Sequence, residues 1–375
     1  MNRQGPLSGL RVLEIEAIGP VPFAAMLLSD LGADVLRVDR PAAPELGVPR
    51  DPRFELSSRG RRSVVVDLKE PAGVERALCL AERADILLEG MRPGVMERLG
   101  LGPDKCLARN PKLIYGRMTG WGQHGPLADT VGHDINYIAT TGVLHAIGSR
   151  DGPPAVPLNL VGDFGGGALV LAFGVLAALH EARASGQGQV VDAAMVDGSL
   201  ALLAPVIGRW QSGAWRDQRE ANALDGGAHF YGCYATSDGQ AVAVGALEPR
   251  FYAALLKGLG LSPDALPPQH DRSAWPAMRA RLAALFAQHP CEHWVKVFEG
   301  TEACVSPVLS IAEAMRNAHL WARGSLVELD GVLQPAPVPR FSRTPGAVAG
   351  PPVPRGGGGE DALADWGLAA PGGVA

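Results

Sequence analysis

Residues 11–118 alternate between short apolar runs and helical segments, and this alternation constrains the fold more than any other feature of the chain. The pattern predicts buried strands at residues 11–15, 34–38, 63–68, 86–89 and 113–118, and helices at 23–31 and 72–84. Strands separated by helices pair in parallel, because a parallel connection needs about a dozen residues or more. The sequence therefore predicts an α/β fold built on a parallel sheet.

The chain has 375 residues, which is enough for two domains of about 100–200 residues each. We predict a large domain over residues 1–195, linker helices over 196–231, a smaller α+β domain over 232–316, a return segment to the large domain over 317–350, and a flexible linker with a short C-terminal helix over 351–375. Within the large domain we expect a helix at 134–146 and a long apolar helix headed by Asp163.

Composition limits the class of protein. The formal net charge of -5 argues against a general nucleic-acid binder. The five cysteines form no CxxC pair, which indicates reduced thiols in a cytoplasmic protein. Residues 1–10 contain no apolar signal core, and the richest apolar run, 168–179, is shorter than the roughly 18 residues of a membrane span. We expect a cytoplasmic protein that binds neither membrane nor nucleic acid.

The turn after the first strand, Gly19-Pro-Val-Pro, lacks the glycine fingerprint of dinucleotide-binding folds, and its prolines lack N–H donors for a pyrophosphate. Cationic residues instead recur around the predicted strand ends. Since guanidinium groups bind phosphates in a bidentate manner, the set favours a ligand with several phosphates. The set comprises Arg37, Arg40, Arg59, Arg61, Arg62, Lys69 and Arg92.

Five motifs together carry a family resemblance. They are Gly-His-Asp-Ile-Asn-Tyr at 132–137, Tyr-Gly-Arg-Met-Thr-Gly-Trp-Gly-Gln at 115–123, Pro-Leu-Asn-Leu-Val-Gly-Asp-Phe-Gly-Gly-Gly at 157–167, the glycine-bounded stretch 186–198, and Val-Gly-Ala-Leu-Glu-Pro-Arg-Phe-Tyr at 244–252. With them the chain closely resembles the alpha-methylacyl-CoA racemases of the family III CoA-transferase superfamily (CaiB/BaiF type). The resemblance covers nearly the whole chain and fades after about residue 350.

The resemblance implies a reaction and an architecture. Its members interconvert (R)- and (S)-2-methylacyl-CoA thioesters by 1,1-proton transfer, without a metal or an organic cofactor, so that CoA is part of the substrate. They fold as an intertwined homodimer with a large Rossmann-like CoA-binding domain and a small domain.

The resemblance also implies the site residues. His133 and Asp163 match the acid/base pair, and Glu248 matches a carboxylate brought to the same site from the partner's small domain. The residues that match the CoA-binding set are Arg40, Val66, Asp67, Leu68, Lys69, Glu89, Arg92, Gly132, Asp134, Ile135, Asn136 and Tyr137.

These residue types suit the chemistry. Histidine exchanges protons near neutrality, and a predicted helix begins at His133. Asp163 is expected to cap the long apolar helix, whose N-terminus would lower its pKa. The backbone N–H of Asp134 is our candidate donor to the enolate oxygen, so that alanine at this position should cost little. Glu16 and Val21 are bulkier than the resemblance suggests, and we expect them to alter the acyl pocket or a dimer contact.

Two alternatives stay open. In a family III CoA-transferase, the residue matching Asp163 is a nucleophile that forms an anhydride and then an enzyme-bound thioester. In a CoA-binding protein without catalysis, the basic strand ends would matter and His133 would not. The sequence also leaves open which base acts on which epimer, and whether the acyl group is a branched fatty acid, a sterol side chain or an arylpropionate.

Overall fold

The computed structural model describes residues 3–42 and 51–368. The chain divides into two compact units: unit 1 comprises Met1–Thr141, Leu158–Leu202 and Asn317–Ala375, and unit 2 comprises Gly142–Pro157 and Leu203–Arg316. These limits differ from the predicted domains chiefly at residues 142–157, which were expected in the large domain. The reason is Arg219, whose guanidinium donates to the carbonyls of Ser149 (2.8 Å), His145 (3.1 Å) and Gly152 (2.9 Å).

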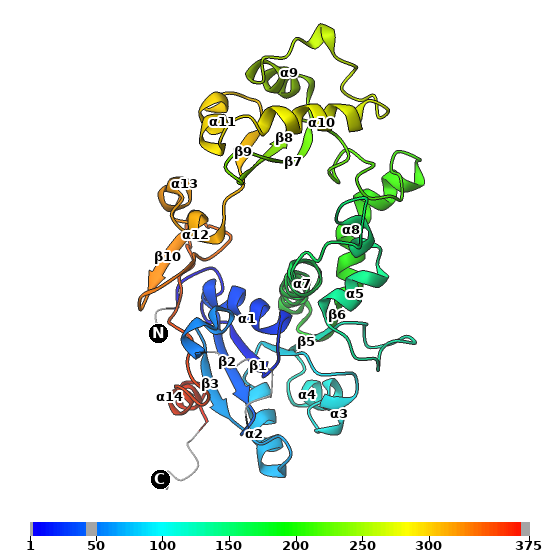
Figure 1. The fold of residues 1–375 in the computed structure, drawn as a ribbon. Coiled ribbons are helices and arrows are strands. Elements are labelled where there is room, and N and C mark those ends of the chain that lie inside the picture. Colours follow the sequence, from blue (N-terminus) through cyan, green and yellow to red (C-terminus); the bar gives the residue numbers. More distant parts are fainter. Residues whose placement is uncertain (1–2, 43–50, 369–375) are drawn as a thin grey trace. The chain divides into compact units, whose positions relative to one another are not determined.

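Unit 1 is built on one six-stranded parallel sheet with the order β3-β2-β1-β4-β5-β6 (Figure 1). The strands are β1 (Arg11–Ile15), β2 (Asp34–Asp39), β3 (Arg62–Val65), β4 (Ile86–Glu89), β5 (Ile114–Thr119) and β6 (Gln189–Ala194). The predicted α/β fold with a parallel sheet is therefore confirmed. The third strand ends at Val65 rather than at residue 68, because a turn follows in which the Asp67 side chain accepts from the Lys69 N–H (3.0 Å).

Both faces of this sheet are buried over its inner strands β1, β2, β4 and β5, as a parallel sheet requires. On one face, Val12 and Ile86 pack in a core that includes residues of α1 (Pro20–Asp30) and α7 (Leu169–Ser185). On the other face, their neighbours Leu13 and Leu87 pack in a core with residues of α2 (Pro71–Ala81) and α14 (Gly359–Asp365). The period of two along each strand thus divides the apolar residues between two helical layers (Figure 1).

Six further helical elements of unit 1 are short. They are η1 (Pro52–Phe54), η2 (Leu56–Ser58), α3 (Val95–Arg98), α4 (Pro103–Arg109), α5 (Asp134–Thr140) and α13 (Ala318–Ala322). Helix α8 (Met195–Gln211) runs from unit 1 into unit 2, and the strands β10 (Leu326–Leu329) and β11 (Val332–Pro335) form a hairpin in unit 1.

Two predicted helices differ from the structure. The helix expected at 134–146 is divided into α5 and α6 (Val143–Ala146) by Gly142, which has φ 83°. The long apolar helix begins before Asp163, as a π-helical segment, η3 (Leu160–Ala168), that continues into α7. Its glycines let it approach α8 closely, since a Cβ on Gly166 would lie 2.7 Å from the Ser199 nitrogen.

The continuous helix Leu160–Ser185 has 26 residues and a mean hydropathy of 1.8 over its most apolar window, of which 39% is buried. By length and composition alone it could cross a membrane, contrary to the expectation that no segment of the chain could. Core helices of soluble proteins meet the same two criteria. This helix packs against β5 and β6 of the sheet.

Unit 2 has its own core, around a three-stranded antiparallel sheet of β7 (Tyr231–Ala235), β8 (Ala241–Gly245) and β9 (Val305–Pro307). The aromatic rings of Tyr234 and Phe286 stack there at 5.1 Å between centroids. The other helical elements of this unit are α9 (Pro249–Gly258), η4 (Pro263–Ala265), α10 (Trp275–Phe286), α11 (Cys291–Phe298) and α12 (Ile311–Ala314).

The C-terminal segment is packed and hydrogen-bonded, so its prediction as a flexible linker is wrong for the described residues up to 368. Gly350 and Gly357 accept backbone bonds from Gly60 and Ser63, at 2.8 and 2.9 Å. Trp366 is 1% exposed and donates its indole N–H to Asp34 (2.9 Å). Helix α14 therefore covers the edge of the sheet next to β3. Residues 369–375 lie outside the described part of the chain.

Replacing Trp366 with alanine should destabilise unit 1 by about 3–5 kcal/mol, because it empties a fully buried site and leaves the Asp34 bond unmade. Urea unfolding followed by circular dichroism measures this loss. Trp321 is 44% exposed, and its replacement with alanine is the control, with an expected cost below about 1 kcal/mol. Equal losses in the two variants would contradict a structural role for α14.

Candidate active site

The strand order reverses direction between β1 and β4, and open α/β sheets bind ligands beyond the carboxyl ends of the strands at such a point. The β1–α1 turn lies there and contains Gly19, with φ 66°. A Cβ on Gly19 would lie 3.1 Å from Oδ2 of Asp163. The carboxylate of Asp163 therefore lies against the turn at the switch point of the sheet.

Asp163 is the fourth residue of η3 and is half-buried. Its Oδ2 accepts from the Asn159 amide (3.0 Å), and its backbone N–H donates to Oδ1 of Asp134 (2.7 Å). Burial raises the pKa of Asp163, the Asn159 bond opposes this, and the charge of Asp134 adds to it. The expected N-cap position and lowered pKa are both wrong, because the helix begins three residues earlier and the carboxylate is partly buried against Gly19.

His133 immediately precedes α5 and is exposed. Its backbone N–H donates to the side-chain oxygen of Asn136 (3.0 Å), which fixes the entry to the helix. A positive charge on His133 lowers the pKa of Asp163, so the two side chains lie within electrostatic range of each other. The structure thus brings the two predicted acid/base residues into one region of unit 1.

Tyr137 closes one side of this region. Its ring meets Trp121 edge-on at 4.9 Å between centroids, and its hydroxyl donates to the carbonyl of Gly132. Burial raises the pKa of Tyr137, the charge of Asp163 raises it further, and Arg92 opposes the rise. The ring fits because residue 120 is glycine, where a Cβ would lie 2.0 Å from it.

The predicted CoA-binding residues fall into two groups. Arg40, Lys69, Arg92, Ile135 and Asn136 are exposed, whereas Val66, Leu68, Asp134 and Tyr137 are buried, with Asp67 and Gly132 between these extremes. A hollow of about 320 Å³ adjoins the predicted CoA-binding residues Val66 and Asp67. It is lined by Val65, Val66, Asp67, Glu70, Ala72, Gly73 and Arg76.

Glu89, the remaining member of this set, is fully buried. Its carboxylate accepts from Arg117 (2.9 Å) and from the Met91 N–H (2.6 Å). Burial raises its pKa to about 7 against the opposing effect of these bonds. Its side chain therefore supports the end of β4 from inside and is not presented to a ligand.

Five of the seven cations interpreted as phosphate ligands form ion pairs within the chain, and in four of these pairs the arginine is not exposed; the fifth is Arg40, which pairs with Glu16 (3.2 Å). Arg59 and Arg61 form buried ion pairs with Asp30 (2.5 Å) and Glu14 (3.0 Å), Arg37 pairs with Asp39 (2.6 Å), and Arg62 pairs with Asp34 (2.8 Å). Arg59, Arg61 and Arg62 lie at or before the amino end of β3, the wrong end for a ligand. Only Arg40, Lys69 and Arg92 of the set are exposed.

Glu248 belongs to unit 2, where it is exposed and immediately precedes α9. Its role remains a prediction. Asn159 and Arg117, which hold Asp163 and Glu89, were not among the predicted site residues. The i, i+4 spacing of Asn159 and Asp163 would have indicated the role of Asn159 if the predicted helix had begun at Leu160, where the structure starts it. Within 3–42 and 51–368, no cluster of three or more metal-ligating side chains occurs.

Known proteins resemble the chain over most of its length. It is 46% identical to an alpha-methylacyl-CoA racemase of Mus musculus over 341 residues, which are 90% of this chain and 87% of that protein. It is 44% identical to one of Homo sapiens, with 90% of each chain covered. A CAIB/BAIF family protein from Brucella suis has a similar fold, with a TM-score of 0.83, 24% identity, and coverage of 97% of this chain and 100% of that one.

The sequence profile described as CoA-transferase family III matches residues 7–360, which include every candidate residue of the site. The protein therefore belongs to CoA-transferase family III.

Proposed function

We propose that the protein is an alpha-methylacyl-CoA racemase, an isomerase that interconverts (R)- and (S)-2-methylacyl-CoA thioesters by 1,1-proton transfer through an enolate. The identity of 44–46% to racemases over 90% of the chain supports this function. The observation that carries it is geometric: the exposed His133 adjoins Asp134, whose Oδ1 accepts from the backbone N–H of the half-buried Asp163 at the switch point of the sheet.

Racemisation beside a thioester needs one base on each face of C2. One base removes the proton, and the other, already protonated, delivers a proton to the opposite face. A raised pKa suits Asp163 to this role, because it lies closer to the ordinary pKa of a histidine, so that a proton can move in either direction. His133 and Asp163 could then exchange roles in the two directions of the reaction.

The enolate oxygen requires hydrogen-bond donors. We assign the backbone N–H of Asp134 to this role, since it lies at the first turn of α5, next to His133. The side chain of Asp134 has a separate role, because its Oδ1 holds the Asp163 backbone. The expectation that alanine at this position costs little is therefore withdrawn.

We propose further that the active form is a homodimer, in which Glu248 of the partner subunit joins the site. Large exposed apolar side chains on neighbouring elements of unit 1 support a second copy as their partner, because exposed apolar surface of this kind is typical of interfaces between subunits. They are Leu160, Leu169, Phe173, Leu200 and Leu202 of η3, α7 and α8, and Phe173 is 76% exposed.

The reaction as proposed needs no metal and no organic cofactor, since CoA itself supplies the thioester that acidifies C2. We place the enzyme in the cytoplasm and in fatty acid and lipid metabolism. All five cysteines are free thiols, which supports a reducing compartment. The preference among branched fatty acyl, sterol side-chain and arylpropionyl groups stays open.

The first test is proton NMR of the protein with (S)-2-methylacyl-CoA in deuterated water. Deuterium should enter C2 with loss of stereochemical purity, and His133→Ala and Asp163→Ala should each slow this by at least about 100-fold. Prior treatment with a chelator should leave the rate unchanged. Transfer of CoA to an added carboxylate without exchange at C2, together with a hydroxylamine-sensitive thioester on Asp163, would instead establish a CoA-transferase.

Replacing Asp134 with alanine should lower kcat by about 10–100-fold, because Asp163 loses the acceptor that holds its backbone. Asparagine keeps an acceptor oxygen and should restore most of kcat. Both variants remove a negative charge that raises the pKa of Asp163, so both should shift the acid limb of the pH–kcat profile to lower pH. An alanine variant with wild-type kcat would refute this role for the side chain.

Mixing His133→Ala with Glu248→Ala subunits tests the shared site. If Glu248 acts across the dimer, each mixed dimer contains one intact site, and random assortment restores about a quarter of the wild-type sites. Each variant alone should be inactive and should sediment as a dimer. No recovery of activity after co-refolding would mean that Glu248 acts within its own subunit or not at all.

A further inference from the structure

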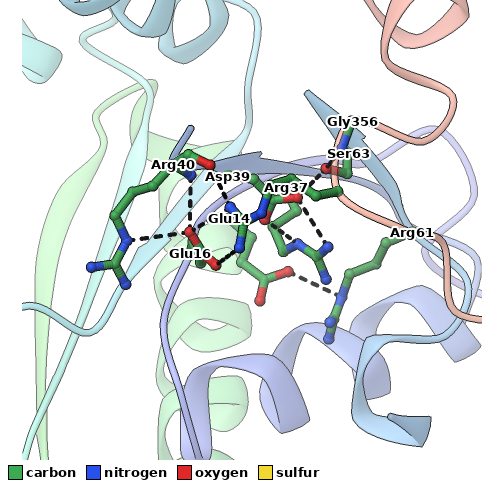
Figure 2. Close-up of polar contacts among 9 residues, drawn as sticks. Glu14, Glu16, Arg37, Asp39, Arg40, Arg61, Ser63 and Gly356 are labelled. Atoms are coloured by element: carbon green, nitrogen blue, oxygen red, sulfur yellow. Dashed lines mark hydrogen bonds and ion pairs between the residues drawn. The ribbon is translucent and has the colours of Figure 1, made fainter. Parts of the chain in front are cut away.

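The carboxylate of Glu16, the residue that follows β1, joins two arginines from distant parts of the chain. Its Oε2 accepts from the backbone N–H of Arg40 (2.9 Å) and from Nε of Arg40 (3.2 Å), as Figure 2 shows. Arg355 of the C-terminal segment binds the same carboxylate with both terminal nitrogens, at 2.7 Å to Oε1 and 3.1 Å to Oε2. Glu16 is 9% exposed, so this contact is nearly closed to solvent.

Arg355 also donates to the backbone carbonyl of Arg40. The N–H and the C=O of Arg40 are therefore both held, one by Glu16 and the other by Arg355. The next residue, Gly356, donates its N–H to the hydroxyl of Ser63 (2.8 Å), which anchors the segment to β3 (Figure 2). Arg40 is thereby fixed at the carboxyl end of β2 by a segment more than 300 residues away in the sequence.

The three carboxylates around the ends of β1 and β2 bind four guanidinium groups, so one positive charge is not neutralised. Glu14 pairs with Arg61 and Asp39 with Arg37, so these four groups balance (Figure 2). Burial alone would raise the pKa of Glu16, but the bonds from Arg355 and Arg40 hold it below its ordinary value, so this residue stays a carboxylate. Two guanidinium groups therefore share one carboxylate. The side chain of Arg40 is 46% exposed, and among the described residues its terminal nitrogens have no partner.

We propose that Glu16 and Arg355 are positioning residues that hold Arg40 for the phosphate on the ribose of CoA, so that the C-terminal segment forms part of the CoA-binding site. In doubly wound sheets, groups that follow the second strand face the adenosine ribose, and an arginine there accommodates a ribose phosphate. The inference rests on the proposed function. It also replaces the expectation that Glu16 alters the acyl pocket or a dimer contact.

The test compares the affinities for CoA and for dephospho-CoA, which lacks the ribose phosphate, by calorimetry with the full-length protein. Glu16→Gln and Arg355→Ala should each weaken the binding of CoA by about tenfold, the loss expected when one charge-assisted bond is misaligned. The affinity for dephospho-CoA should change by less than about twofold, and kcat at saturating substrate should stay the same, since the reacting carbon is untouched.

Asp365→Ala is the matched control, because it removes another carboxylate–guanidinium contact of the same segment, to Arg62, without touching Arg40. It should leave the preference for CoA over dephospho-CoA unchanged. The inference would be overturned if Asp365→Ala lost the preference for CoA over dephospho-CoA as much as the test variants do. It would also be overturned if both test variants kept the wild-type preference and the wild-type melting temperature. Those results leave the racemase proposal standing, whereas a wild-type protein that binds no CoA would refute both.

Discussion

A parallel sheet has to be covered on both faces, and the architecture of unit 1 follows from this requirement. The helices between the first five strands, up to Thr119, cover only part of the two faces of the sheet. Helix α7 completes one face and α14 the other, so segments from the middle and the end of the chain return to the same sheet. The carboxyl ends of the strands consequently meet residues from three parts of the sequence, and this convergence makes the site possible.

The candidate acid/base pair depends on one hydrogen bond between segments that are distant in the sequence. Oδ1 of Asp134 accepts from the Asp163 N–H, and so joins the start of α5 to the π-helical segment η3. Irregular helical turns of this type are costly and frequent at functional sites. Here the carboxylate of Asp163 lies against Gly19 and its burial raises its pKa, while the glycines around Gly166 allow the close packing on α8.

The arginines of unit 1 illustrate how much of a charge pattern is internal. Arg59 and Arg61 are almost fully buried and neutralise Asp30 and Glu14, whereas Arg40 has a side chain nearly half exposed beside a shared carboxylate. Buried ion pairs of this kind hold elements together without presenting a charge to a ligand. A cation left over after pairing can attract a phosphate, and for Arg40 the pairing depends on Arg355, outside the motifs that carry the family resemblance.

The sequence by itself determined the strand and helix periods, and hence the parallel sheet, because side-chain alternation and helix length are local properties. Its motifs also identified His133 and Asp163 as the candidate pair. Only the tertiary structure decided that Asp163 belongs to a π-helical segment and has a raised pKa, that Glu89 is buried against Arg117, and that Arg355 reaches Glu16. Burial and ion pairing depend on residues far apart in the chain, and no local pattern specifies which of them will meet.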